Sequence, residues 1–420
     1  MVMDSQTSIV GWVDFSSMER DRVSQVLSML QEKGTLDELG IGQIRDAFAD
    51  KLFPGFSTIQ TRAKYFASVP YLFYDYRQLD LNVRRNLPLA EFIQQQENQL
   101  AKNLVRNHSE NMPYGIIGKD SLEKGVARRP SSVYWNGLRQ FGIAKTDVSL
   151  KDFIEQFEQY ANYPNDAHVD DDEQLSSLAR MMTKSTDYHP NWSESATIAL
   201  SKAEAEFLRD MLLLSKNIEY SIPAQLVKHK LLEKALELDD ALESGIWRID
   251  ALYQWLKSSA ISSQTKSCLE KALEFSFVLE GAHIRYNSLI AERANNTASQ
   301  GLLVEEFQIW LREAQKHRHR FKLESINEWY LCAFGIEKNS NSRTRQFIEQ
   351  WCNLIMNNAT EDKLDKCIKQ QAIANKGPRC LLKKALSDQQ DWVGMRKLEF
   401  RWPTAKIILQ DIHEGLYVSA

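Results

Sequence analysis

The segment 128–139 has the composition of a surface that contacts nucleic acid. Its guanidinium groups could pair with phosphates, and its hydroxyl, amide and ring groups could hydrogen-bond to bases or stack on them. The surrounding residues 101–145 contain eight Lys or Arg against three acidic residues. An equally good interpretation is a basic packing surface for an acidic protein, including the chain's own 166–173 segment. The candidate residues are Arg128, Arg129, Ser132, Tyr134, Asn136 and Arg139.

A second segment, 57–66, has the residue types of a DNA recognition helix. Its hydroxyl and amide groups could hydrogen-bond to phosphates or base edges, and its two cations add positive charge. A helix that begins at Ser57 would also offer free backbone N–H groups to a phosphate. An ordinary capped surface helix has the same composition, so both interpretations stay open. The candidate contacts are Thr58, Gln60, Arg62 and Lys64.

Signatures of catalysis and of metal binding are weak. Residues 115–119 imitate the end of a phosphate-binding P-loop, but the two glycines are too close and no Ser or Thr follows the lysine. His317 and His319 are two positions apart, which places them on different sides of a helix and argues against a shared metal. The five cysteines contain no CxxC pair, a pattern typical of reduced, mostly buried thiols. We therefore expect no catalytic residue, metal or cofactor, although an active site assembled from scattered residues stays open.

Composition predicts a mainly helical protein. Only 17 of the 420 residues are Gly and only 10 are Pro, so turn residues are scarce. Hydrophobic residues make up 43% and charged residues 26%, with a net charge of −4. These values are ordinary for globular domains and exclude a disordered or strongly cationic chain.

Helical periodicity indicates the elements that must position the candidate residues. Apolar spacing predicts long helices over 89–107 and 264–294. A further helix is expected to begin at Ser57 and to be closed by Pro70. Ser131 is the predicted N-cap of the helix that follows the arginine pair.

The chain is expected to contain two helical regions. Short helices separated by glycines predict helix-turn-helix or winged-helix-like units over 1–155. An acidic linker or loop is expected over 156–190, because residues 155–175 contain seven acids and no Lys or Arg. A larger helical domain is expected over 191–420.

The start of the sequence carries no export signal. Residues 1–15 lack a basic stretch followed by a long apolar one. No apolar run approaches the ~20 residues that a membrane-spanning helix needs. We therefore expect a cytoplasmic protein with no membrane partner.

Several blocks of the sequence resemble a bacterial family catalogued as a domain of unknown function. The resemblance is carried by GWVDFS at 11–16, by residues 34–66 with the following Val69-Pro70-Tyr71, by RRPSSVYWNGLRQFGI at 128–143, and by LEFRWPTAKIILQDI at 398–412. It implies a genomic context in anti-phage defence loci, beside helicase and phospholipase-D-like nuclease genes. It implies no catalytic residues.

These features together predict a non-enzymatic DNA-binding or adaptor subunit of a bacterial anti-phage defence system. Its expected partners are double-stranded DNA and a helicase or nuclease of the same locus. The alternatives are a protein-interaction scaffold without nucleic-acid contact and a divergent nuclease.

Overall fold

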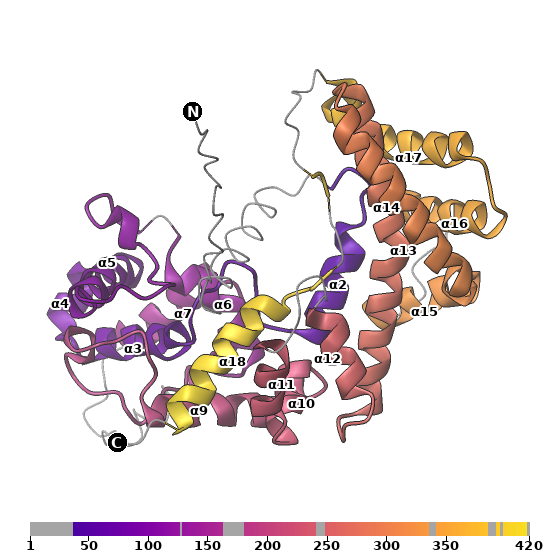
Figure 1. Cartoon of the computed structure of the whole chain (residues 1–420). Helices are drawn as coiled ribbons and strands as arrows, with labels where there is room; N and C mark the ends of the chain where they lie inside the picture. The colour runs from indigo at the N-terminus through magenta and orange to yellow at the C-terminus, as the bar shows by residue number, and fades with distance from the viewer. Residues whose placement is uncertain are drawn as a thin grey trace, which may run out of the picture. The chain divides into compact units, whose positions relative to one another are not determined.

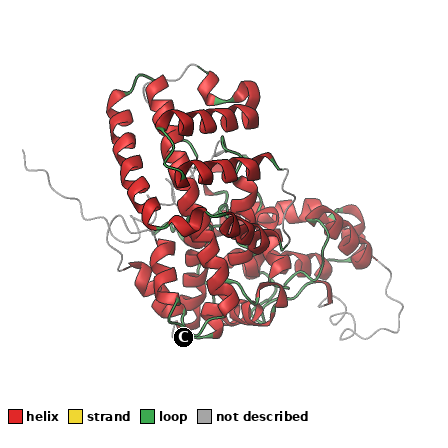
Figure 2. Ribbon diagram, turned by 90° about the vertical axis from the view of Figure 1, so that its right-hand side faces the viewer, coloured by secondary structure: helices red, strands yellow, loops and turns green. Residues whose placement is uncertain are grey.

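The fold is mainly helical, as the composition predicts. The computed structural model describes residues 37–126, 128–162, 180–240, 248–335, 342–384, 392–394 and 398–417. Helices account for 71% of them, and their β structure consists of an isolated antiparallel bridge between Ala144 and Met182. Figure 2 shows helices joined by loops throughout this part of the chain.

The expected winged-helix detail is not confirmed. The part of the chain described supplies no β-hairpin that could form a wing. The sequence also predicts a short strand at residues 9–13 and a helix over 17–33, and both lie outside the described residues. A helix-turn-helix or winged-helix-like unit therefore stays a prediction.

The first group of helices surrounds α3. This helix packs against α5, α6 and α9, while α7 packs against α4, α5 and α6 (Figure 1). The predicted helix over 89–107 is confirmed as α5. The bounds are α3 Lys64–Gln78, α4 Leu81–Asn86, α5 Leu89–Asn107, α6 Pro130–Gln140 and α7 Leu150–Asn162. The helix that precedes this group, α2 Gly42–Leu52, contacts α13 Ser263–Arg293 and α15 Leu323–Phe334.

The prediction for α3 was wrong at both ends. The helix begins at Lys64 rather than Ser57, and Pro70 lies inside it. Residues 57–63 form turns because their backbone groups bond to side chains: Gln60 accepts from Ser57 N–H and donates to the Gly55 carbonyl. The helix continues past Pro70 because apolar residues on all its sides are buried, and this packing outweighs one lost backbone hydrogen bond.

The second group joins two distant parts of the sequence. Helix α18 packs along α9 and also contacts α11 (Figure 1). Ser201 and Glu204 form a capping box at the start of α9, each side chain bonding the other's backbone N–H. The bounds are α9 Lys202–Leu214, α10 Ile222–Lys228, α11 Leu232–Asp240 and α18 Trp402–Tyr417.

The third group is built on the long helix α13. It contacts α2, α12, α14, α15, α16 and α17. Trp329 of α15 and Trp351 of α16 are fully buried and anchor the core of this group. The bounds are α12 Arg248–Leu256, α13 Ser263–Arg293, α14 Thr297–Lys316, α15 Leu323–Phe334, α16 Arg343–Met356 and α17 Glu361–Lys376.

The chain divides after Gly34, and the second unit, residues 35–420, is compact. All the helices above belong to the second unit. Within it, helices from before and after residues 156–190 pack together, since α3 contacts α9 and α2 contacts α13 and α15. The domain boundaries expected from the sequence stay a prediction. No described helix is long and apolar enough to cross a membrane.

The contact between α13 and α14 depends on Gly281. A Cβ there would lie 2.3 Å from the buried ring of Trp310, which also donates from Nε1 to the Phe277 carbonyl at 2.9 Å. We expect Gly281→Ala to lower the free energy of unfolding by roughly 1–3 kcal/mol, because this overpacking outweighs the better helix propensity of alanine. Urea denaturation measures the change.

Gly301 provides the matched control within α14, because a Cβ there meets no atom within 4 Å. Gly301→Ala should leave stability unchanged or raise it by up to about 1 kcal/mol. Equal stabilisation by both substitutions would contradict the packing role of Gly281.

Candidate functional site

An open cleft of about 1140 Å³ lies among α2, α6, α13 and α15. Its lining is mixed: α2 contributes carboxylates and a lysine, and α6 contributes amides. The far wall carries two thiols, from α13 and α15. The residues with these groups are Asp46, Asp50, Lys51, Asn136, Gln140, Cys268 and Cys332.

The two thiols of the cleft influence each other's pKa. The hydrogen bond from Cys268 lowers the pKa of Cys332; burial opposes this, and the charges of Lys51 and Lys271 add to it. The same hydrogen bond and burial raise the pKa of Cys268.

The start of α6 is held by a buried carboxylate from α5. Glu97 Oε1 accepts the backbone N–H of Ser131 at 2.6 Å. Ser131 is thus inside the first turn rather than at the N-cap predicted for it, a position that Arg129 occupies. Burial raises the pKa of Glu97 to about 7, although the Ser131 hydrogen bonds and the charge of Arg129 oppose the shift.

The predicted contacts on α6 divide into an exposed set and a buried residue. Arg128, Ser132 and Asn136 are exposed, whereas Arg129 and Arg139 are half-buried. Ser132 and Asn136 are four residues apart and therefore lie on one face of the helix. Asn136 lies within the cleft lining. Arg139 Nε donates to the Thr146 carbonyl.

Tyr134 is part of the core rather than of the exposed face. It is fully buried, and its ring packs edge-on against Phe66. Its hydroxyl accepts from the backbone N–H groups of Thr61 and Arg62 and donates to the Arg62 carbonyl. Tyr134 thereby fastens α6 to the loop before α3.

Arg62 and Lys64 form ion pairs with distant helices. Arg62 Nε and Nη2 bond the carboxylate of Asp411 on α18, with a shortest distance of 2.7 Å. Lys64 Nζ bonds both oxygens of Glu204 on α9 at 2.7 and 2.8 Å. Burial raises the pKa of Asp411, while hydrogen bonds from Arg62 and from Ala63 N–H oppose the shift.

The other two predicted contacts of segment 57–66, Gln60 and Thr58, differ in exposure. Gln60 is 1% exposed and is used by the Gly55–Ser57 turn. Thr58 is half-buried. The structure therefore does not bring residues 57–66 to the surface as one helical face. Their contact with nucleic acid stays a prediction.

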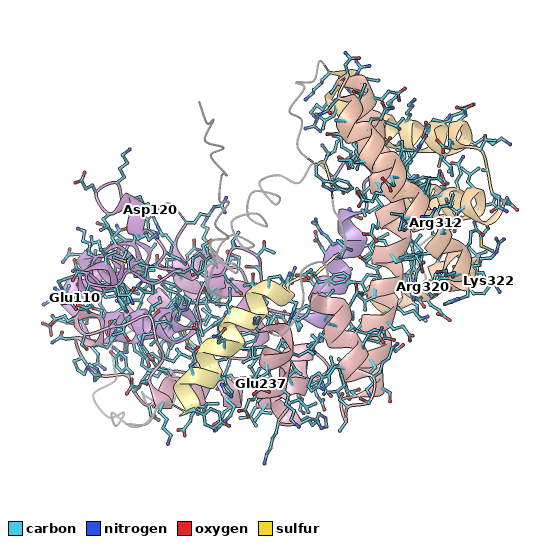
Figure 3. The ribbon with its side chains drawn as sticks, in the orientation of Figure 1. Glu110, Asp120, Glu237, Arg312, Arg320 and Lys322 are labelled. Atoms are coloured by element: carbon cyan, nitrogen blue, oxygen red, sulfur yellow. The ribbon has the colours of Figure 1, made fainter. Side chains whose placement is uncertain are left out.

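A cluster of cations follows the C-terminal end of α14. Arg312 and Lys322 are exposed, and Figure 3 shows them with Arg320. The Arg320 guanidinium lies 5.2 Å from the centre of the Phe277 ring, and Arg318 donates to the Met356 carbonyl. Cations are favourable at a helix C-terminus. The described residues contain no group of three or more His, Cys, Asp or Glu that could hold a metal ion.

Sequence reasoning missed the residues that partner the predicted ones. Asp411 and Glu204 are 349 and 140 positions from their cations. Cys268 and Cys332 lie on separate helices, without a spacing that links them. Only Glu204 had a local signal, because Ser201 precedes it at capping-box spacing.

The fold and the cleft define a mainly helical protein whose N-terminal and C-terminal helices share one packed unit. The chain belongs to the family described as "Family of unknown function (DUF6361)", whose model matches residues 7–415. The resemblance to a family of unknown function is thus confirmed at the level of the family. No curated protein and no solved structure matches the chain.

The Lys64–Glu204 pair should contribute strongly to stability. We expect Lys64→Met to lower the free energy of unfolding by about 3–5 kcal/mol, because it leaves the Glu204 carboxylate buried without its cation. Lys151 and Glu155 form an exposed i,i+4 pair on α7. Lys151→Met should change stability by less than about 0.5 kcal/mol. Similar losses in the two variants, measured by urea denaturation, would contradict the role given to Lys64.

Glu97 should make stability depend on pH. Its carboxyl pKa is raised from 4.5 to about 7, so the folded state binds its proton more tightly than the unfolded state does. The free energy of unfolding should therefore fall by roughly 3 kcal/mol as pH rises from 4.5 to 7.

The variant Glu97→Gln should remove this part of the pH dependence, because the amide keeps an acceptor for Ser131 N–H and does not titrate. Glu91 is exposed on the same helix, and Glu91→Gln should retain the wild-type profile. Parallel profiles for wild type and Glu97→Gln, from denaturation at several pH values, would refute the assignment.

Proposed function

We propose that this protein is a non-enzymatic DNA-binding or adaptor subunit that contacts nucleic acid through the start of α6. In the setting suggested by the family resemblance, it would place a helicase or nuclease of an anti-phage defence system on double-stranded DNA. The supporting observation is the exposure of Arg128 and Ser132 beside the half-buried Arg129, at the first turn of a helix.

The way α6 is held supports this proposal. Glu97 bonds the first turn, and the Tyr134 hydroxyl bonds the loop before α3. A fixed helix presents its cations without losing much conformational freedom when a ligand binds. Phosphate pairing by arginines supplies affinity that is independent of base sequence, which suits a subunit that positions a partner enzyme.

The proposed nucleic-acid surface contains fewer residues than the sequence suggested. Arg62 and Lys64 are committed to carboxylates of this chain, and Tyr134 and Gln60 are buried. The proposal therefore rests on Arg128, with contributions from the neighbouring residues Arg129, Ser132, Asn136 and Arg139.

We expect the double substitution Arg128→Ala with Arg129→Ala to weaken duplex binding across unrelated sequences. Each lost phosphate contact should make the slope of log affinity against log salt shallower by about one. Fluorescence anisotropy with labelled duplexes at several salt concentrations measures both quantities. Arg128→Ala alone should change the free energy of unfolding by no more than about 0.5 kcal/mol, because Arg128 is exposed.

The control removes the same charge from the surface at α14 and after it, by Arg312→Ala with Lys322→Ala (Figure 3). Equal loss of affinity in both double variants would reduce the effect to net charge. Unchanged DNA binding with loss of a co-purifying protein would favour the scaffold alternative. Cleavage of DNA by the purified chain with Mg²⁺ or Mn²⁺, abolished by a point substitution, would favour the nuclease alternative.

A further inference from the structure

A basic surface follows α17 and the two short turns after it. Residues 361–384 contain seven Lys or Arg against three acidic residues. The turns Gly377–Arg379 and Leu381–Lys383 pack against α17, which itself packs against α13 and α16 (Figure 1). All seven cations are exposed except one, Lys376, which is half-buried. They are Lys363, Lys366, Lys369, Lys376, Arg379, Lys383 and Lys384.

Two arginines from neighbouring helices extend this surface. Arg343 at the start of α16 donates to the Ala374 carbonyl of α17 at 2.6 Å. Arg293 at the end of α13 donates to the Lys384 carbonyl at 3.3 Å. Both arginines are exposed, and a neutral carbonyl does not cancel their charge. These two residues and the seven cations of 361–384 are called the α17 surface below.

Three lysines of the α17 surface form a row along the helix. Lys363, Lys366 and Lys369 are three residues apart, so each lies beside the next on the helix surface. Like charges on neighbouring positions of a helix destabilise it. Positive charge is also unfavourable near a helix N-terminus, where Lys363 lies. The row therefore costs the free chain stability, and a bound polyanion would offset that cost.

The acids of α17 do not neutralise the row. Glu361 and Asp365 both pair with Arg285 of α13, at 2.9 and 2.5 Å. Within the described parts of the chain, no carboxylate forms an ion pair with any lysine of the row. Other exposed lysines of the protein do pair with a nearby carboxylate: Lys151, Lys228 and Lys316. The row therefore keeps its charge for a ligand.

The composition of the α17 surface favours a nucleic-acid backbone over other anionic partners. Protein interfaces are enriched in aromatic residues and depleted in Lys, whereas residues 361–384 contain six lysines and no aromatic residue. A helix that lies in a membrane surface inserts its apolar face, but the apolar face of α17 is buried in the protein. Its buried apolar residues are Leu364, Cys367, Ile368 and Ala372. Lysine pairs with phosphate as a point charge, which needs no particular base.

We propose that the α17 surface is a second nucleic-acid contact, which binds the phosphate backbone of duplex DNA without sequence preference. This inference rests on the proposed nucleic-acid function but uses none of the residues of α6. The whole chain has a net charge of −4, so attraction to DNA depends on such local positive surfaces. Two contacts on one chain bind more tightly than either alone when one DNA molecule engages both.

The test removes the row by the triple substitution Lys363→Gln, Lys366→Gln and Lys369→Gln. Glutamine has nearly the helix propensity of lysine, so the circular dichroism spectrum should be unchanged. Fluorescence anisotropy with labelled duplexes of unrelated sequence should show binding weaker by about tenfold or more at 0.1 M salt. The slope of log affinity against log salt should become shallower by up to about three.

The matched control removes the same charge elsewhere, by glutamine substitution of three exposed lysines on and between α9 and α11. These are Lys202, Lys216 and Lys234. The control variant should bind duplexes within about twofold of the wild type, because charges beyond a Debye length of roughly 10 Å are screened. Equal loss of affinity in both triple variants would overturn the proposal by reducing the effect to net charge.

Comparison with Arg128→Ala with Arg129→Ala separates this inference from the proposed function. Wild-type binding by the lysine variant, with weaker binding by the arginine variant, would overturn the α17 surface and leave the α6 contact in place. The reverse result would support the α17 surface and remove the α6 contact. No duplex binding by the wild-type chain would overturn both. Binding to phosphatidylserine vesicles instead of duplexes, lost in the lysine variant, would overturn the nucleic-acid assignment in favour of a membrane surface.

Discussion

Two largely buried ion pairs, at Arg62 and Lys64, join the start of α3 to α18 and α9. Arg62 bonds Asp411 of α18, and Lys64 bonds Glu204 of α9. Burying such charges costs several kcal/mol per ion unless their hydrogen bonds are satisfied. Here they are, because Asp411 also accepts Ala63 N–H, and Glu204 accepts Ser201 N–H and the Tyr71 hydroxyl. The Arg62 pair joins the segment before α3 to the last described helix.

The position of α6 depends on the loop before α3, which contains Arg62. The Tyr134 hydroxyl bonds the backbone of Thr61 and Arg62, directly before the ion-paired lysine. Glu97 holds the other end of the contact, at Ser131. The exposed face of α6 is therefore oriented by buried polar contacts. One end of this face carries the arginines proposed to meet phosphates, and Asn136 reaches the cleft.

The cleft is lined by α6 and also by helices that carry a different kind of side chain. Its α6 side is lined by amides, and its far wall carries the thiols of Cys268 and Cys332. Lys51 of α2 adds positive charge close to Cys332. The exposed surface of α6 and the thiol-bearing wall both depend on how α2, α6, α13 and α15 pack.

The sequence by itself determined the helical class and many of the elements. Scarce Gly and Pro and a 3.6-residue apolar period sufficed to predict α5 and α13. The buried face of a helix is set by the spacing of apolar residues within that helix, so it can be recognised in a short stretch of sequence. Only the tertiary structure decided which polar residues face solvent. Arg62 and Lys64 have the composition of a DNA contact, yet carboxylates 349 and 140 positions away neutralise them. Cys268 and Cys332 line one cleft for the same reason: contacts between distant segments arise from packing, and no local spacing encodes them.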